Sequence, residues 1–288
     1  MSAPVRWPAE ALWEAVVPRL PGFTVEILPE IDSTNTELMR RARAGRYEPT
    51  LLVAERQTAG RGRLGRTWHS AEAGEAGALP SLTFSLGLPL APRDWSGLSL
   101  AVGVSVAESL QPVLPAPGTT PRIGLKWPND LWLSDAAGDR KLGGILIETA
   151  SFHDLHNAST TSPGAQATRY VVVGVGLNVL PRSPEGLSTR PGCLQELGPL
   201  DAPTALLQVA APLVALLQGF AAQGFAPLQD RFAARDVLRG RTVVLSDGQS
   251  GLAQGVGADG ALQVHTAQGL QAITSSEVSV RPTAAPPA

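Results

Sequence analysis

A nine-residue stretch rich in glycine and arginine, Gly60 to Trp68 (GRGRLGRTW), constrains this chain more than any other feature. It follows Leu51 to Arg56 and Gln57, and that apolar run is typical of a buried strand. Glycines let backbone N–H groups approach a ligand, and guanidinium groups match carboxylate and phosphate oxygens. At the end of a strand, such a loop predicts an anion-handling site on an α/β sheet. The alternative is a solvated loop or a weak nucleic-acid patch.

The charge pattern restricts the binding site to a local feature. The 23 basic and 25 acidic side chains nearly balance, which argues against a general polyanion-binding surface. Among the basic residues only Lys126 and Lys141 are lysines, so both are candidates for chemistry that needs a compact ammonium group. The single cysteine, Cys193, excludes an internal disulfide and fits a reducing compartment.

Two further observations concern location. The N-terminus has no basic region followed by an apolar run, and we find no segment near the roughly 20 apolar residues that span a bilayer. We therefore expect a cytoplasmic protein without a membrane partner.

Residue periodicity predicts a mixture of helices and strands. Helices are expected over 8–20, 34–45, 95–111, 204–220 and 226–238. Thr34 and Glu37 have capping-box spacing at the start of the second helix, which ends near Gly45, and Pro212 is expected to kink or break the fourth. Strands are expected over 23–28, 51–56, 81–88, around Lys126 and from Leu131, over 141–149 and over 170–179. After Arg239, short strands with Asp-Gly and Gln-Gly turns predict a small all-β module of about five strands. The expected division is a large domain over 1–238, the module over 239–282 and a disordered tail over 283–288.

The sequence lacks the motifs of several enzyme classes. It has no G-x-S-x-G elbow, no Walker loop and no His-Glu-x-x-His, and His153 and His156 lie in a polar excursion that is a poor metal site. The remaining arginines, lysines, hydroxyls and amides suit a reaction in which two substrates react with each other while the protein orients them.

Five ordered motifs resemble those of biotin protein ligases. They are DSTN from Asp32, ERQTAGRGRLGRTW from Glu55, KWPNDL from Lys126, RKLGGILIE from Arg140 and GVGLNV from Gly174. The match covers roughly residues 23–180, and the C-terminal module is similar to the SH3-like β-barrel of that family. The resemblance implies an α+β fold, with a mixed-sheet catalytic domain similar to class II aminoacyl-tRNA synthetases and lipoate ligases.

The resemblance also implies a chemistry and a set of site residues. The chemistry is activation of biotin by ATP to biotinyl-5′-AMP, with transfer to a lysine of a biotin carboxyl carrier protein. The residues that match biotin-contacting positions are Ser33, Thr34, Asn35, Gln57, Arg61, Gly62, Arg63 and Lys126, and those on the nucleotide side are Arg63, Arg66, Trp68 and Asn178. Arg63 and Lys126 are expected to be catalytic, because they can draw a carboxylate and an α-phosphate together. Mg²⁺ is expected to arrive with ATP and to bind through its phosphates.

Two departures from the family and two alternatives remain open. The segment His69 to Pro80 is longer and more acidic than the short turn found in relatives, and only one helix fits before Phe23, so no DNA-binding domain and no DNA partner are expected. The alternatives are a lipoate-protein ligase and a biotin-sensing regulator without turnover. The sequence does not fix the carrier, the order of binding or the oligomeric state, including whether a homodimer forms.

Overall fold

The fold is organised by a seven-stranded mixed sheet with the strand order β1-β2-β3-β7-β6-β5-β4. The structure is a computed structural model, and it describes residues 5–68, 78–116, 120–152, 168–187, 189–245, 248–274 and 281–282. The strands are β1 (Thr24–Ile31), β2 (Thr50–Gln57), β3 (Ser81–Leu90), β4 (Arg122–Lys126), β5 (Asp130–Asp135), β6 (Gly138–Ser151) and β7 (Arg169–Asn178). Among these described strands only the β1–β2 pair is parallel, so the predicted α+β class with a mixed sheet is confirmed.

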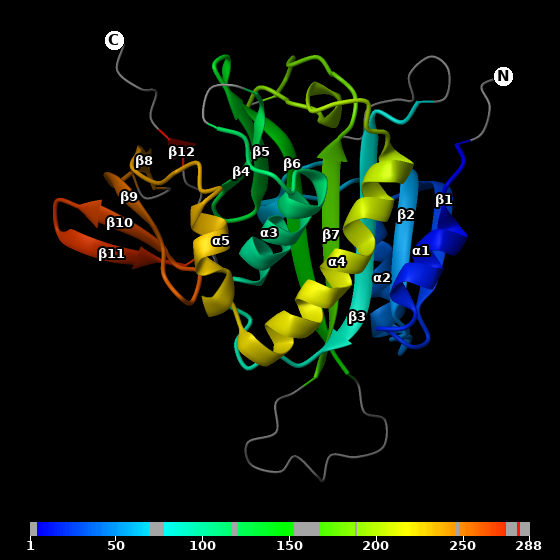
Figure 1. Cartoon of the computed structure of the whole chain (residues 1–288). Coiled ribbons are helices and arrows are strands. Elements are labelled where there is room, and N and C mark those ends of the chain that lie inside the picture. The colour runs from blue at the N-terminus through cyan, green and yellow to red at the C-terminus, as the bar shows by residue number, and fades with distance from the viewer. Residues whose placement is uncertain are drawn as a thin grey trace, which may run out of the picture.

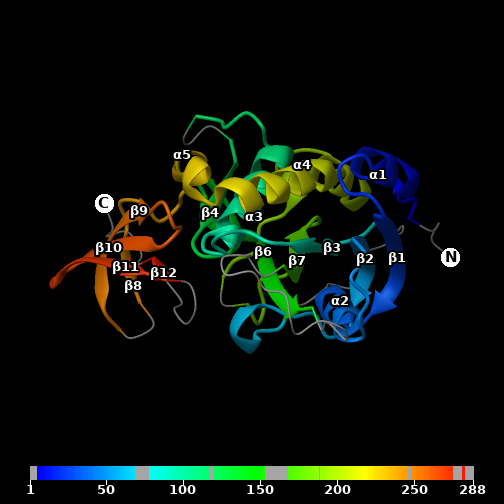
Figure 2. The same cartoon turned by 90° about the horizontal axis from the view of Figure 1, so that it is seen from below.

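Helices cover both faces of this sheet. On one face lie α1 (Ala9–Val16), α3 (Leu98–Leu110) and α4 (Ala202–Gln223), and on the other lies α2 (Thr34–Arg43), as Figures 1 and 2 show. Alternate side chains of β7 therefore enter two different apolar clusters. Val171, Val173 and Val175 join the larger one, whereas Val172 joins the smaller one beneath α2. This two-sided burial explains the continuous apolar sequence of the strand.

The N-terminus of α2 differs in one detail from expectation. The helix begins at Thr34 as predicted, but its N-cap is Ser33, whose Oγ accepts the N–H of Thr36 at 3.4 Å. The predicted cap of Thr34 with Glu37 is wrong, because the Glu37 carboxylate instead accepts from Arg40 and Arg41. A carboxylate in the first helical turn is stabilised there by the helix dipole as well.

The helix α4 is a single helix that continues through Pro212, and it is long and apolar enough to cross a membrane by length and composition alone. Our expectation that no segment approaches such a length was wrong for this helix. The core helix of a globular domain meets the same criterion, and here Leu206, Leu213 and Leu217 are buried in the main apolar cluster. The helix packs against α3 and β3.

The predicted helix over 226–238 is shorter than expected. A 3-10 turn, η4 (Ala226–Leu228), leads into α5 (Gln229–Ala233), after which the chain runs beside β4. The N–H of Leu125 donates to the carbonyl of Arg235 at 2.7 Å, and the N–H of Val237 donates to the carbonyl of Leu125 at 3.1 Å. Pairing with the β4 edge ends the helix, because this edge would otherwise expose unpaired backbone groups.

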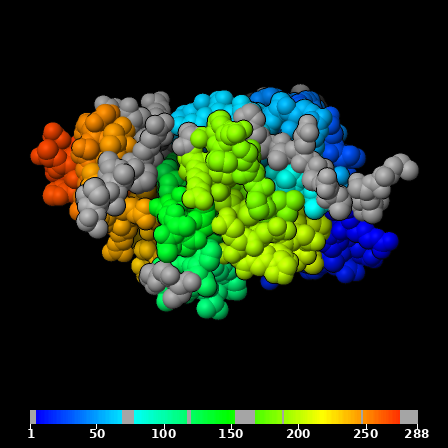
Figure 3. Space-filling view, turned by 90° about the horizontal axis from the view of Figure 1, so that it is seen from above, coloured from blue at the N-terminus to red at the C-terminus, as the bar shows by residue number. Residues whose placement is uncertain are grey.

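The C-terminal module contains a five-stranded antiparallel sheet, as predicted. Its strands are β8 (Thr242–Val244), β9 (Ser250–Val256), β10 (Leu262–Thr266), β11 (Gly269–Ile273) and β12 (Arg281–Pro282). Figure 3 shows the module at one end of the molecule and α1 near the other. Trp127, buried after β4, donates its indole N–H to the carbonyl of Gly260 at 3.1 Å and so ties the module to the large domain. The predicted tail over 283–288 lies outside the described residues.

Candidate active site

A cavity of about 460 Å³ opens between the N-terminus of α2, the loop after β2, and strands β4 to β7. All the site residues expected from the sequence line it: Ser33, Thr34, Asn35, Gln57, Arg61, Gly62, Arg63, Arg66, Trp68, Lys126 and Asn178. These residues come from separate segments of the chain, and the fold brings them to one place.

One end of the cavity presents hydroxyl and amide groups from the start of α2 and the end of β2. Ser33 and Thr34 are buried at the start of α2, and the Gln57 side-chain oxygen accepts the N–H of Thr34 at 2.8 Å. This contact joins the helix start to the end of β2. Asn35 lies beside them, and its amide donates to the Leu146 carbonyl at 3.2 Å. Hydroxyls and amides held in this way suit a neutral ligand with several hydrogen-bonding groups.

The glycine-arginine loop closes on itself over the cavity. The N–H of Trp68 donates to the carbonyl of Gly60 at 2.9 Å, and the N–H of Gly62 donates to the carbonyl of Arg66 at 2.7 Å. At the tip, Leu64 and Gly65 both have positive φ, of 56° and 70°, as a type I′ turn requires. The Leu64 side chain is 59% exposed. Its backbone is strained, because a leucine rarely adopts a positive φ.

Arg61 connects this loop to strand β6. One guanidinium nitrogen lies 3.1 Å from the Glu148 carboxylate on β6, and the same carboxylate accepts from the Asn35 amide at 3.0 Å. Glu148 therefore links the loop to the start of α2.

The other end of the cavity is cationic. Lys141 Nζ lies 2.7 Å from Asp130 Oδ1, and Lys126 Nζ lies 3.9 Å from Asp130 Oδ2 and 5.4 Å from the centre of the Trp132 ring. The Arg63 guanidinium lies 3.5 Å from Asn129 Oδ1. Burial lowers the pKa of Arg63, and the negative charge of Asp130 opposes that shift. Several cations around a single carboxylate favour an anionic ligand.

Comparisons with known proteins agree with this geometry. Residues 27–161 match the Biotin/lipoate A/B protein ligase family, and residues 240–281 match the Biotin protein ligase C terminal domain. The bifunctional ligase/repressor BirA of Escherichia coli is 33% identical over 92% of this chain and 77% of its own length. A biotin--[acetyl-CoA-carboxylase] ligase of Paracoccus denitrificans is 30% identical over 88% of this chain and 98% of its own length. The chain belongs to the biotin protein ligase family.

A solved structure supports the same assignment at the level of the fold. The biotin protein ligase from Aquifex aeolicus in complex with biotin and ATP superposes with a TM-score of 0.68 and 28% identity, over 90% of this chain and 99% of that one. The chain is therefore an enzyme of the ligase class, and its activity is ATP-dependent biotinylation. The lipoate-ligase and turnover-free alternatives are not favoured.

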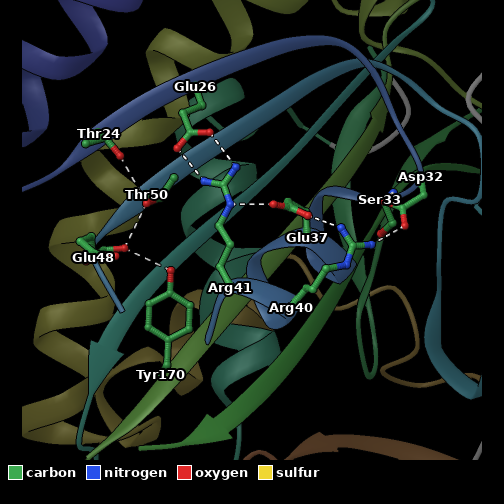
Figure 4. A network of polar contacts seen from close by, with 10 residues as sticks. All are labelled: Thr24, Glu26, Asp32, Ser33, Glu37, Arg40, Arg41, Glu48, Thr50 and Tyr170. Atoms are coloured by element: carbon green, nitrogen blue, oxygen red, sulfur yellow. Dashed lines mark hydrogen bonds and ion pairs between the residues drawn. The ribbon is translucent and has the colours of Figure 1, made fainter. Parts of the chain in front are cut away.

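A polar network outside the cavity anchors the α2 helix of the ligase (Figure 4). Arg41 forms two hydrogen bonds with Glu26, of 2.6 and 2.8 Å, and these contacts raise its pKa further above the usual arginine value. At the other end of the network, Arg40 donates to Asp32 at 2.7 Å, and the other oxygen of Asp32 accepts the N–H of Ser33 at 2.7 Å. The network thereby holds the residue that caps the helix.

The predicted nucleotide-side residue Asn178 already serves the protein itself. Its amide donates to the carbonyls of Lys141 at 3.1 Å and Gly192 at 3.0 Å, and its oxygen accepts from Arg182 at 3.4 Å. Asn178 thus fixes the segment after β7, and Arg182 from that segment also lines the cavity.

Sequence reasoning assigned neither Lys141 nor Asp130 to the binding site, although both line the cavity. Lysine scarcity makes Lys141 a candidate for chemistry without placing it in the site, and the fold reveals Asp130 as its partner. Among the described residues, no group of three or more His, Cys, Asp or Glu side chains could hold a metal. His153 and His156 lie outside the described residues, as does most of the segment from His69 to Pro80.

Proposed function

We propose that this ligase joins biotin and ATP to form biotinyl-5′-AMP and then transfers the biotinyl group to a lysine of a biotin carboxyl carrier protein. The polarity of the cavity carries the proposal. The hydroxyl and amide groups of Ser33, Thr34 and Gln57 suit the neutral ureido ring, and the cationic end suits a carboxylate beside a phosphate.

In the first step a biotin carboxylate oxygen attacks the α-phosphorus of ATP. The bond between the α-phosphorus and the bridging oxygen breaks, and pyrophosphate leaves with the electron pair. Arg63 and Lys126 are the proposed catalytic residues, because both line the cationic end and reduce the repulsion between two anions. Lys141 and Lys126 both lie near Asp130, so Lys141 adds to the positive electrostatic potential at this end of the cavity.

In the second step the neutral ε-amine of the carrier lysine attacks the carbonyl carbon of the mixed anhydride. The C–O bond to AMP breaks, and the lysine proton leaves to solvent or to the departing phosphate. The glycine-arginine loop covers this reaction centre, which protects the anhydride from water.

The nucleotide is proposed to contact Arg66, Trp68 and the Asn178 region. The indole N–H of Trp68 is buried and has no acceptor within the described part of the chain, so a ligand atom is a suitable partner. Mg²⁺ is proposed to arrive on the ATP phosphates, where it neutralises charge. Asp130 is the only carboxylate among the described residues lining the cavity, and its contact with Lys141 disfavours a protein-bound metal.

The domain division is part of the same proposal. Residues 1–238 form the catalytic domain and 239–282 the SH3-like module, in line with the two matched segments. We place the reaction in the cytoplasm, where ATP is available and Cys193 stays reduced. Burial raises the pKa of the Cys193 thiol, which makes it a poor nucleophile and a bystander.

The experiment is an isotope exchange between pyrophosphate and ATP, run with biotin and with lipoic acid. Exchange with biotin alone, followed by labelled biotin on a carrier lysine, is the expected result. Exchange with lipoic acid instead would overturn the substrate assignment. A footprinting assay with biotin and ATP tests the accompanying prediction that the ligase does not bind DNA, and sedimentation tests whether it forms a homodimer.

A further inference from the structure

Behind the cavity wall, a buried serine lies within hydrogen-bond distance of two lining residues. Ser85 on β3 is fully buried and does not line the cavity. Its Oγ lies 2.6 Å from Asn35 Oδ1 and 2.7 Å from Thr34 Oγ1. A hydroxyl has only one proton, so Ser85 can donate to only one of these two oxygens.

The orientation of the Asn35 amide decides which oxygen receives that proton. Its nitrogen donates to the Leu146 carbonyl at 3.2 Å and to the Glu148 carboxylate at 3.0 Å, so a flipped amide would place its oxygen against two acceptors. Asn35 Oδ1 therefore faces Ser85 and can only accept. The backbone of Gly174 also lies against this amide, because a Cβ there would fall 2.0 Å from Asn35 Oδ1.

Thr34 is then left as the donor to Ser85. Among the described residues, two acceptors lie within reach of its hydroxyl, Ser85 Oγ at 2.7 Å and Gln57 Oε1 at 3.1 Å. Gln57 Oε1 already accepts the Thr34 backbone N–H at 2.8 Å, and the Ser85 contact is the shorter one. The Thr34 proton thus points away from the cavity, and its lone pairs are available to a ligand N–H.

The Ser33 hydroxyl has the opposite hydrogen-bonding role and can donate to a ligand. Its Oγ accepts the N–H of Thr36 as the helix cap, so its own proton is available to a ligand carbonyl. Adjacent residues therefore present one donor and one acceptor.

We propose that Ser85 is a positioning residue that sets Thr34 as a hydrogen-bond acceptor, so that Ser33 and Thr34 together recognise neighbouring C=O and N–H groups. This pattern occurs in a cyclic urea and is absent from a dithiolane ring. The inference rests on the proposed function, since it assigns the polar end of the cavity to the ureido ring. It adds a specificity determinant that touches no substrate atom.

The first test replaces Ser85 with alanine. Ser85→Ala is expected to raise the KM for biotin in pyrophosphate exchange by roughly tenfold, the effect of leaving a buried hydrogen bond unmade, with little change in kcat. Ser105→Ala is the matched control, because Ser105 is also a buried serine but lies in α3 and has no partner within the described residues. An unchanged KM in Ser85→Ala would overturn the inference.

A double-mutant cycle separates this role from general packing. In a Thr34→Val background, Ser85→Ala is expected to change the biotin KM by less than about twofold, because the group that Ser85 orients is gone. Effects that add fully would show that Ser85 acts independently of Thr34. If wild type shows no exchange with biotin, the proposed function fails; an active wild type with an additive cycle rejects this inference alone.

Ligand analogues provide a readout that does not require Ser85→Ala to fold. Thr34 is proposed to accept a hydrogen bond from one ureido N–H, and methylation of that nitrogen removes the donor. Wild type is therefore expected to bind this N-methylbiotin isomer roughly tenfold more weakly than the isomer methylated on the other nitrogen. Thr34→Val is expected to abolish that difference. Equal binding of both isomers to wild type, or an unchanged preference in Thr34→Val, would overturn the inference.

Discussion

The indole ring of Trp68 lies directly against the backbone of Gly176. A Cβ atom on Gly176 would fall 2.6 Å from the ring, which is closer than real contacts allow. The second glycine of the GVGLNV motif therefore provides the flat surface on which the loop tryptophan rests. This contact couples the end of the glycine-arginine loop to the central strand β7.

Gly176→Ala is accordingly expected to displace Trp68 and to lower kcat/KM for ATP by about 10- to 100-fold, because small misplacements of positioning groups have effects of that size. The measurement is pyrophosphate exchange at varied ATP. Gly219→Ala is the matched control, because no atom of the described residues lies within 4 Å of the added Cβ there. Equal activity of the two variants would show that the position of Trp68 is unimportant.

Lys126→Arg is expected to slow adenylate formation by about a hundredfold. This is expected even though arginine occupies nearly every other basic position of the chain. Lys126 is largely buried between Asp130 and the Trp132 ring, and the wider guanidinium fits that space poorly. Transfer from supplied biotinyl-AMP is expected to suffer less. Arg122→Lys on the same strand is the control exchange, and near-normal pyrophosphate exchange in Lys126→Arg would refute the catalytic role.

Arg63→Gly is expected to leave the fold intact and to release biotinyl-AMP, which then labels lysines of an added bystander protein. The ligase itself should gain little label, because it has only two lysines, Lys126 and Lys141. Peptide mapping of both proteins measures this. Arg56→Gly, which removes an arginine that pairs with Glu30 outside the cavity, is the control. Slower carrier labelling with an unlabelled bystander would contradict the retention role.

The sequence predicted the strands and the cavity well because local patterns report them. The valines of β7 form a continuous apolar run, and the glycine-arginine loop carries its chemistry in adjacent residues. The sequence could not predict that α5 ends at Ala233. That end depends on the pairing of Val237 with Leu125, which lies on a strand more than a hundred residues away. The capping residue of α2 was missed because Ser33 and Thr34 are both good N-caps and only the contacts of Glu37 distinguish them.

Residues proposed to act in the site were missed for related reasons. A serine such as Ser85 inside a buried strand has no sequence signature, since its partners Thr34 and Asn35 come from a helix on another segment. Lys141 was noticeable from lysine scarcity alone. Its contact with Asp130 depends on the pairing of β5 with β6.

Asp236 gives a prediction about pH at the junction with the C-terminal module. Burial raises the pKa of this carboxyl, although hydrogen bonds from the N–H groups of Leu238 and Arg239 oppose the shift. A raised pKa means that ionisation is less favourable in the folded state than in the unfolded state. The penalty is absent below the ordinary pKa of aspartate, where both states are protonated, and it is fully present once pH exceeds the raised value.

Asp236→Asn keeps an oxygen that can accept the Leu238 N–H, a contact of 2.8 Å, and removes the buried charge. The variant is therefore expected to gain stability over wild type, by about 1 kcal/mol at neutral pH. This advantage should shrink as pH falls through the raised pKa and vanish below the ordinary aspartate range. Urea unfolding of both proteins across this interval measures the difference. Asp230→Asn, on α5 near the same junction, is the matched control. A wild type that is more stable than Asp236→Asn at neutral pH would show that the ionised carboxylate stabilises the junction.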